Sequence, residues 1–134
     1  MCLNSKWRFP KRAKKDIVCY KILEKVETDN DDEYYTPYQD TEVDITKPFK
    51  AKGISLSFSN NTRYEKTKGY IHTISSLEYI KTYLRGFGGI KFVIFKCHIP
   101  KGTKYHESIY DVEYCSRKIV FDREVQSYEI HDIH

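Results

Sequence analysis

Histidine and cysteine side chains are the groups in this sequence best suited to binding a metal. The chain has five histidines and four cysteines, and a zinc site could be drawn from Cys97, His98, His106 and Cys115. Cys97 and His98, however, are adjacent in a stretch with strand character, and adjacent strand residues point to opposite faces of a sheet. No two cysteines have the two-residue spacing of a zinc knuckle or a redox motif. We therefore expect reduced thiols, no metal site and no cofactor.

Two other sets of polar residues match reactive sites in composition alone. The acidic run from Asp29 to Glu33 lacks the central glycine and the distal glutamate of a calcium loop. A hydrolytic triad could be drawn from Ser116, His72 and Glu113, but Ser116 lacks the sharp turn that presents such a nucleophile. We therefore expect a binding protein rather than an enzyme.

Cations and tyrosines together favour a ligand that is anionic and carries an aromatic ring. The net charge is +4, the chain has 12 tyrosines, and Arg63, Lys66 and Lys68 form a basic segment. Cations attract phosphate groups, and aromatic rings stack on bases. The sequence thus predicts non-catalytic binding of a nucleotide-type ligand. The predicted ligand-binding residues are Tyr70, His72, Arg85, Tyr105, Arg117 and Lys118.

Arg117 has two alternative roles. It shares a strand parity with Cys115, Ile119 and Phe121, which is a largely apolar set. A guanidinium on such a face is costly to bury unless an anion meets it. That anion is either a ligand or an internal carboxylate. The candidate carboxylates are those of Glu107, Asp111 and Glu113.

Hydrophobic patterns predict mostly strands. The run FVIFKCHI from Phe92 is apolar on both parities, so we expect it at the centre of a sheet, paired with a strand from Tyr114 to Phe121. Further strands are predicted over 16–26, around 43–45, over 54–59, where apolar residues alternate with serines, and over 69–74.

One helix is predicted over about residues 76–85. Leu77, Ile80 and Leu84 form its apolar stripe. Ser75 and Glu78 have the spacing of a capping box, which marks the helix start.

These elements predict one α+β domain over residues 1–134. We expect a mostly antiparallel, twisted sheet of five to seven strands with the helix packed across it. Residues 1–15 are predicted to be a basic N-terminal arm, and residues 122–134 an edge strand or a frayed tail. No membrane-spanning segment is expected.

Two short segments resemble motif blocks of ADP-ribosyltransferases. These segments are Tyr70 to Thr73 and Glu113-Tyr114. The resemblance implies a distantly related fold and an alternative function as an ADP-ribosyltransferase-like enzyme. The sequence departs from that family in its first strand, which offers Lys21 but no arginine or histidine to hold the dinucleotide, and in Asp111, which stands where the companion of the family's glutamate is expected.

Five blocks resemble a set of short uncharacterised proteins of bacteriophages and prophages that begin with MCL. The blocks are DIVCYK (16–21), YTPY (35–38), GYIHT (69–73), IPKGTKY (99–105) and YCSRKIVF (114–121). The resemblance implies an accessory protein, of a kind that often acts against host defence, in the cytoplasm of a bacterial host. Its expected partner is a nucleotide-derived molecule, or alternatively a host enzyme that it inhibits. Direct nucleic-acid binding is not expected, and a homodimer or higher homo-oligomer is compatible with the aromatic content.

Overall fold

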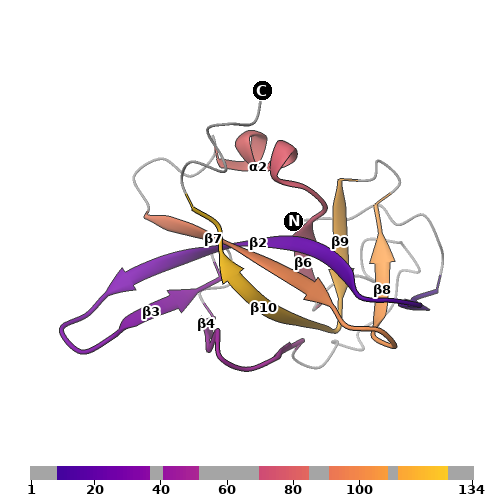
Figure 1. Cartoon of the computed structure of the whole chain (residues 1–134), viewed down its shortest axis with the longest axis horizontal. Coiled ribbons are helices and arrows are strands. Elements are labelled where there is room, and N and C mark those ends of the chain that lie inside the picture. The colour runs from indigo at the N-terminus through magenta and orange to yellow at the C-terminus, as the bar shows by residue number, and fades with distance from the viewer. Residues whose placement is uncertain (1–8, 37–40, 52–69, 85–90, 109–111, 127–134) are drawn as a thin grey trace, which may run out of the picture.

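A computed structural model describes residues 9–36, 41–51, 70–84, 91–108 and 112–126. Within these residues the chain forms strands and one helix (Figure 1). The strands are β1 (Lys11–Arg12), β2 (Ile17–Glu27), β3 (Asp32–Tyr35), β4 (Glu42–Val43), β5 (Phe49–Lys50), β6 (Ile71–Ile74), β7 (Phe92–Ile99), β8 (Lys104–Glu107), β9 (Glu113–Ser116) and β10 (Lys118–Glu124). The helix is α2 (Leu77–Leu84).

All described strand pairs are antiparallel and belong to one sheet of ten strands, ordered β1-β8-β9-β6-β2-β7-β10-β5, with β3 joining β2 to β4. The expected antiparallel α+β class is therefore confirmed for the described residues. The expected five to seven strands were too few. The ADP-ribosyltransferase-like fold is not supported.

The ladder between β2 and β7 forms the centre of the sheet. It runs from the pair Ile17 and Ile99 to the pair Glu24 and Phe92. Both strands were predicted from their apolar patterns, and the central position of β7 is confirmed because β2 and β10 flank it. In Figure 1 β2 is the long indigo strand that crosses the molecule.

The strand predicted over Tyr114 to Phe121 is in fact two strands that meet at Arg117. β9 pairs with β6 and β8, whereas β10 pairs with β7 and β5. Ser116 and Lys118 are separated by one residue in the chain, yet their strands are separated in the sheet by β6, β2 and β7. The sheet must therefore curve strongly to bring β9 and β10 together at Arg117.

Two hydrophobic clusters cover the two faces of the β2–β7 ladder. One face holds Cys19, Leu23, Phe95 and Cys97, which pack with residues of β10 such as Ile119. The other face lies beneath the helix. Its buried residues are Ile22, Ile74, Ile80, Ile94 and Val125.

Helix α2 lies within the predicted range and covers the second of these faces (Figure 1). Ile80 is fully buried, as the apolar stripe predicted. The helix begins one residue after Ser76, and the N–H of Ser75 donates to the carbonyl of Val112 at 3.0 Å, which ties the helix start to β9. No helix among the described residues is long and apolar enough to cross a membrane.

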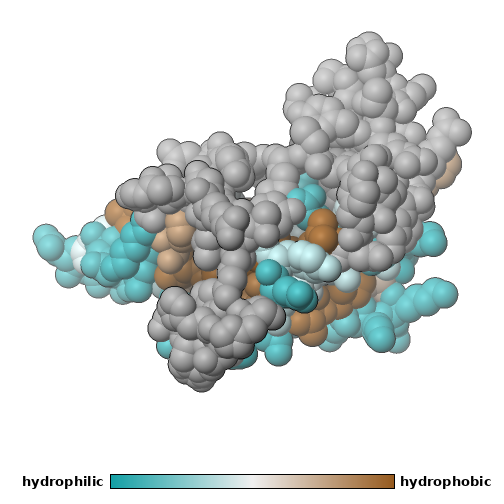
Figure 2. All heavy atoms as spheres, turned by 90° about the horizontal axis from the view of Figure 1, so that it is seen from above, coloured by the Kyte–Doolittle hydropathy of each residue, from teal (hydrophilic) through white to brown (hydrophobic). Residues whose placement is uncertain are grey.

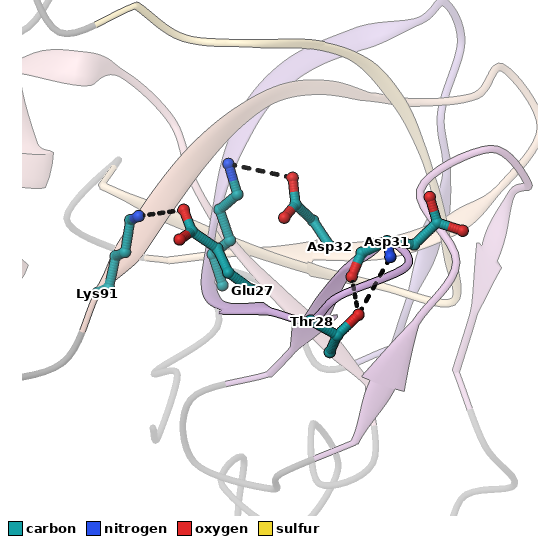
Figure 3. Close-up of polar contacts among 6 residues, drawn as sticks. Glu27, Thr28, Asp31, Asp32 and Lys91 are labelled. Carbon is teal, nitrogen blue, oxygen red and sulfur yellow. Dashed lines mark hydrogen bonds and ion pairs between the residues drawn. The ribbon is translucent and has the colours of Figure 1, made fainter.

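The acidic run forms the tip of the β2–β3 hairpin (Figure 3). The N–H of Asp31 donates to Thr28 Oγ1 at 3.1 Å, so the threonine hydroxyl closes the turn. Asp32 lies 3.4 Å from the ammonium of Lys25, and Glu27 pairs with Lys91. These pairs place lysines beside two of the carboxylates, and hydrophilic residues cover this end of the molecule (Figure 2).

The predicted basic arm is partly built into the sheet. β1 pairs with β8, and the N–H of Ala13 donates to the carbonyl of Thr103 at 2.9 Å. Ala13 is buried, so residues 11–13 are an edge of the domain rather than a free arm. In the predicted C-terminal tail, β10 continues to Glu124 and Val125 bonds to Ile94. Residues 1–8, the predicted strand over 54–59, the basic segment Arg63 to Lys68, Arg85 and residues 127–134 lie outside the described residues.

Candidate functional site

Three cations lie in one cross-strand row on the same face of the sheet. Arg12 of β1 is the register partner of Lys104 of β8. The N–H of Arg117 donates to the carbonyl of Lys104 at 3.1 Å, which extends the β8–β9 ladder by one residue. Residues directly opposite one another in a ladder project to the same face. We call Arg12, Lys104 and Arg117 the cation row.

The side chains of the cation row are open to an external partner. Arg12 and Arg117 are exposed, and Lys104 is half-buried. The carbonyl of Lys104 accepts its hydrogen bond from Arg117 on the β9 side. Arg12 and Lys104 are therefore a non-hydrogen-bonded pair, in which side chains come closest. Cations directly opposite one another repel, so the row is a place where an anion would lower the free energy.

No ion pair with a carboxylate is seen for the cation row among the residues that the structure describes. Arg12 donates to the carbonyl of Gly102 at 3.0 Å. Glu113 is buried on β9, and Glu107 lies on the opposite face of β8 from Lys104, three residues along the strand. The predicted ion pair between Arg117 and a carboxylate is therefore not found with Glu107 or Glu113, while Asp111 lies outside the described residues.

Arg117 is held by an aromatic ring instead. Its guanidinium carbon lies 5.5 Å from the centroid of the Tyr70 ring. Tyr70 is only 5% exposed, and its ring meets His106 edge-on, with centroids 5.6 Å apart. Arg117 shares the face of Cys115, as its parity predicted, but it is not buried there. β9 ends at Ser116 and β10 begins at Lys118, and the side chain of the residue between them is exposed.

Among the predicted site residues that the structure describes, Tyr70 and Arg117 are in direct contact. Tyr70 is too buried to stack on a ligand base, and its ring lies against the guanidinium. Lys118 is adjacent in sequence and directly opposite Lys50 of β5, which gives a second pair of like charges beside the row.

Tyr105 does not lie on the face of the cation row. It is the register partner of Ser116 and of Lys11, one residue away from the row on each strand, so it projects to the other face. There its ring packs edge-on against Tyr114, with centroids 6.3 Å apart. The prediction that Tyr105 and Arg117 share one site is therefore wrong.

His72 lies on β6, opposite Cys115 of β9. Burial, together with the charge of Lys21, lowers the pKa of His72 from 6.5 to about 4. The imidazole is therefore neutral at pH 7 and brings no positive charge to an anion. Among the described residues its Nδ1 has no hydrogen-bond partner.

Lys21 is a residue with a perturbed pKa that was not among the predicted site residues. Its Nζ donates to the backbone carbonyl of His72 at 2.8 Å. Burial lowers its pKa from 10.5 to about 8. The sequence could have pointed to it through strand parity, because Lys21 shares a parity with Cys19 and Leu23. Both of those residues are fully buried on the core side of β2.

The residues considered for metal binding and hydrolysis do not converge on one site, although His106 and Cys115 are register partners. Cys97 is fully buried on one face of β7, while His98 on the other face places Nδ1 2.9 Å from both oxygens of Asp122. Ser116 projects to the opposite face of β9 from Glu113 and donates its hydroxyl to the carbonyl of Lys118 at 3.2 Å. No group of three metal-ligating side chains able to hold an ion is found within the described ranges.

No protein-family model, curated protein or solved structure matches this chain.

Proposed function

We propose that this protein binds a small anionic ligand of the nucleotide type through the cation row, without changing it chemically. The observation that carries the proposal is the juxtaposition of Arg12, Lys104 and Arg117 on one face, with no described carboxylate to neutralise them. Phosphate is the chemical group that such a row recognises. Arginine binds it with two parallel hydrogen bonds, and lysine adds a point charge.

The fixed position of Arg117 favours binding over a merely solvated surface. A free arginine side chain loses rotamer freedom when it binds, and this loss weakens the complex. The ring of Tyr70, itself fixed against His106, already holds the guanidinium in place. Part of the side-chain entropy that Arg117 would lose on binding is therefore already lost in the free protein.

The resemblance to short phage and prophage proteins supplies the proposed setting. In a bacterial cytoplasm, a small protein that captures phosphate-bearing nucleotides would lower their free concentration. Such sequestration would act against a host defence that signals through nucleotides. The proposal rests on the cation row for its chemistry and on the resemblance for its setting.

Isothermal titration calorimetry with AMP, ADP, ATP and cyclic dinucleotides tests the proposal. We expect at least one of these ligands to bind, and binding to weaken as the salt concentration rises. Arg117→Ala and Lys104→Ala should each weaken binding about tenfold or more, because each removes a charge-assisted contact to phosphate. No binding by any member of the panel would contradict the proposal.

Lys91→Ala is the matched control. It also removes one positive charge, but Lys91 pairs with Glu27 at the hairpin end of the β2–β7 ladder, whereas β1 and β8 lie at the other end. Its effect on affinity should be less than about twofold. Equal losses for Lys91→Ala and Arg117→Ala would show that net charge, and not the cation row, governs binding.

A further inference from the structure

Lys21 lies on a strand face whose other central residues belong to the hydrophobic core. It stands between Cys19 and Leu23 on the core side of the central strand β2, and its register partner on β7 is Phe95. Cys19 and Leu23 are fully buried and Phe95 is nearly so. An unbranched methionine would fill the same space without a charge. A cation is therefore retained here at a cost in stability.

The described residues around Lys21 do not compensate its charge. Within this part of the chain its ammonium donates one hydrogen bond, which runs to the carbonyl of His72 at 2.8 Å. Lys21 forms no ion pair with a carboxylate among the described residues. The groups facing it are neutral at pH 7. Cys19 and Cys97 have thiol pKa values raised by burial, and the pKa of the His72 imidazole is lowered to about 4.

Lys21 is less completely buried than its neighbours. The residue as a whole is half-buried, whereas Cys19 and Cys97 beside it are fully buried. Its amine lies at the buried end of the side chain, where desolvation lowers its pKa, so the labelling experiment below also measures whether a reagent as small as formaldehyde reaches it. Because the two thiols are protonated at pH 7, they do not compete with it as nucleophiles.

We infer that Lys21 is a covalent modification site, whose amine forms an imine with small aldehydes or ketones. The lone pair of neutral Nζ attacks the carbonyl carbon and gives a carbinolamine. Loss of one water, whose oxygen comes from the carbonyl, then leaves a carbon–nitrogen double bond. No oxidant or reductant is needed. The inference does not depend on the cation row.

The environment favours this product for two reasons. First, burial lowers the pKa of Lys21 to about 8, so at pH 7 the fraction of neutral amine is roughly 300-fold larger than for a lysine of pKa 10.5. Second, a neutral imine replaces an ammonium ion on the apolar face, which removes the desolvation cost of the charge.

Reductive methylation of the whole protein tests the inference. The reagents are formaldehyde at limiting concentration, as the aldehyde, and cyanoborohydride, which reduces the imine to a stable amine. Peptide mass spectrometry then gives the rate at each lysine. At pH 7 we expect Lys21 to react about tenfold faster than the exposed residues Lys47 and Lys101, since its lower basicity and partial burial offset part of the gain in neutral amine.

Two outcomes decide the matter without requiring a variant to fold. A Lys21 rate at or below those of Lys47 and Lys101 would overturn the inference. A Lys21 rate that levels off above pH 8 while the other two keep rising would support it. Lys21→Arg, which keeps the charge but offers no amine nucleophile, should remove the fast phase, whereas Lys47→Arg should leave it unchanged.

Discussion

The guanidinium of Arg117 lies over the ring of Tyr70, 5.5 Å from the ring centroid, at the residue where β9 becomes β10. This contact fixes an exposed cation on a buried aromatic ring. It also links the bend in the chain to the proposed binding surface. This contact, and the lowered pKa values of Lys21 on β2 and His72 on β6, each have effects that can be measured.

Truncating Tyr70 should destabilise the fold much more than truncating Arg117, although the two side chains contact each other. Arg117→Ala should lower the free energy of unfolding by less than about 1 kcal/mol, because an exposed cation–π contact contributes little. Tyr70→Ala should lower it by about 3–5 kcal/mol, since it empties a buried aromatic site. Urea unfolding of both variants measures the difference. A large loss for Arg117→Ala would mean that Arg117 serves the fold rather than a ligand.

The stability of the protein should depend on His72 at acidic pH. The pKa of His72 is about 4 in the folded protein and about 6.5 when unfolded, so the unfolded chain binds more protons between these values. Stability is therefore fully present above pH 6.5 and falls as the pH drops toward 4, by at most about 3 kcal/mol. His72→Gln should flatten this part of the stability curve. An unchanged slope in the variant would assign the acid sensitivity to other groups.

Lys21→Met should stabilise the fold. The folded pKa of about 8 lies below the ordinary value of 10.5, so protonated Lys21 opposes folding below pH 8, and this penalty disappears as the pH rises toward 10.5. At neutral pH the variant should gain about 1–3 kcal/mol in unfolding free energy, and the gain should shrink above pH 8. Thermal melts of both proteins at several pH values measure it. A less stable variant at pH 7 would show that the bond to His72 outweighs the buried charge.

The buried thiols should be unreactive in the folded protein. Cys19, Cys97 and Cys115 are fully buried and free, and burial raises the pKa of Cys19 and Cys115 to about 12. On a Cys2→Ser background, Ellman's reagent should therefore detect almost no thiol until a denaturant is added, and then all three. Rapid reaction of the native protein would contradict the described burial.

Elements with strong local patterns could be predicted from the sequence. β7 and β2 follow from runs that are apolar on both faces, and α2 follows from the spacing of Leu77 and Ile80. Both patterns depend only on neighbours in the chain, and burial follows them over most of each element, although Val18 of β2 is 48% exposed. The opposite faces of Cys97 and His98 follow from the same period.

The candidate site was harder to predict because it depends on contacts between distant strands. Nothing in the sequence near Arg117 shows that β9 ends there, since Ile119 and Phe121 continue the apolar parity. Arg12 and Lys104 meet through register, which the sequence does not reveal. Tyr105 was assigned to the wrong face for the same reason, because its face depends on its register with Ser116, which the sequence does not reveal.

The most direct test of the binding proposal is to locate the site by NMR. Backbone amide shifts of ¹⁵N-labelled protein would be followed during titration with inorganic triphosphate, which isolates the phosphate from any base. We predict that the largest shifts occur at Arg12, Lys104 and Arg117, and that they are lost in the Lys104→Ser, Arg117→Ser double variant. Largest shifts at residues remote from this row, or none at millimolar triphosphate, would contradict the proposal that the cation row binds phosphate.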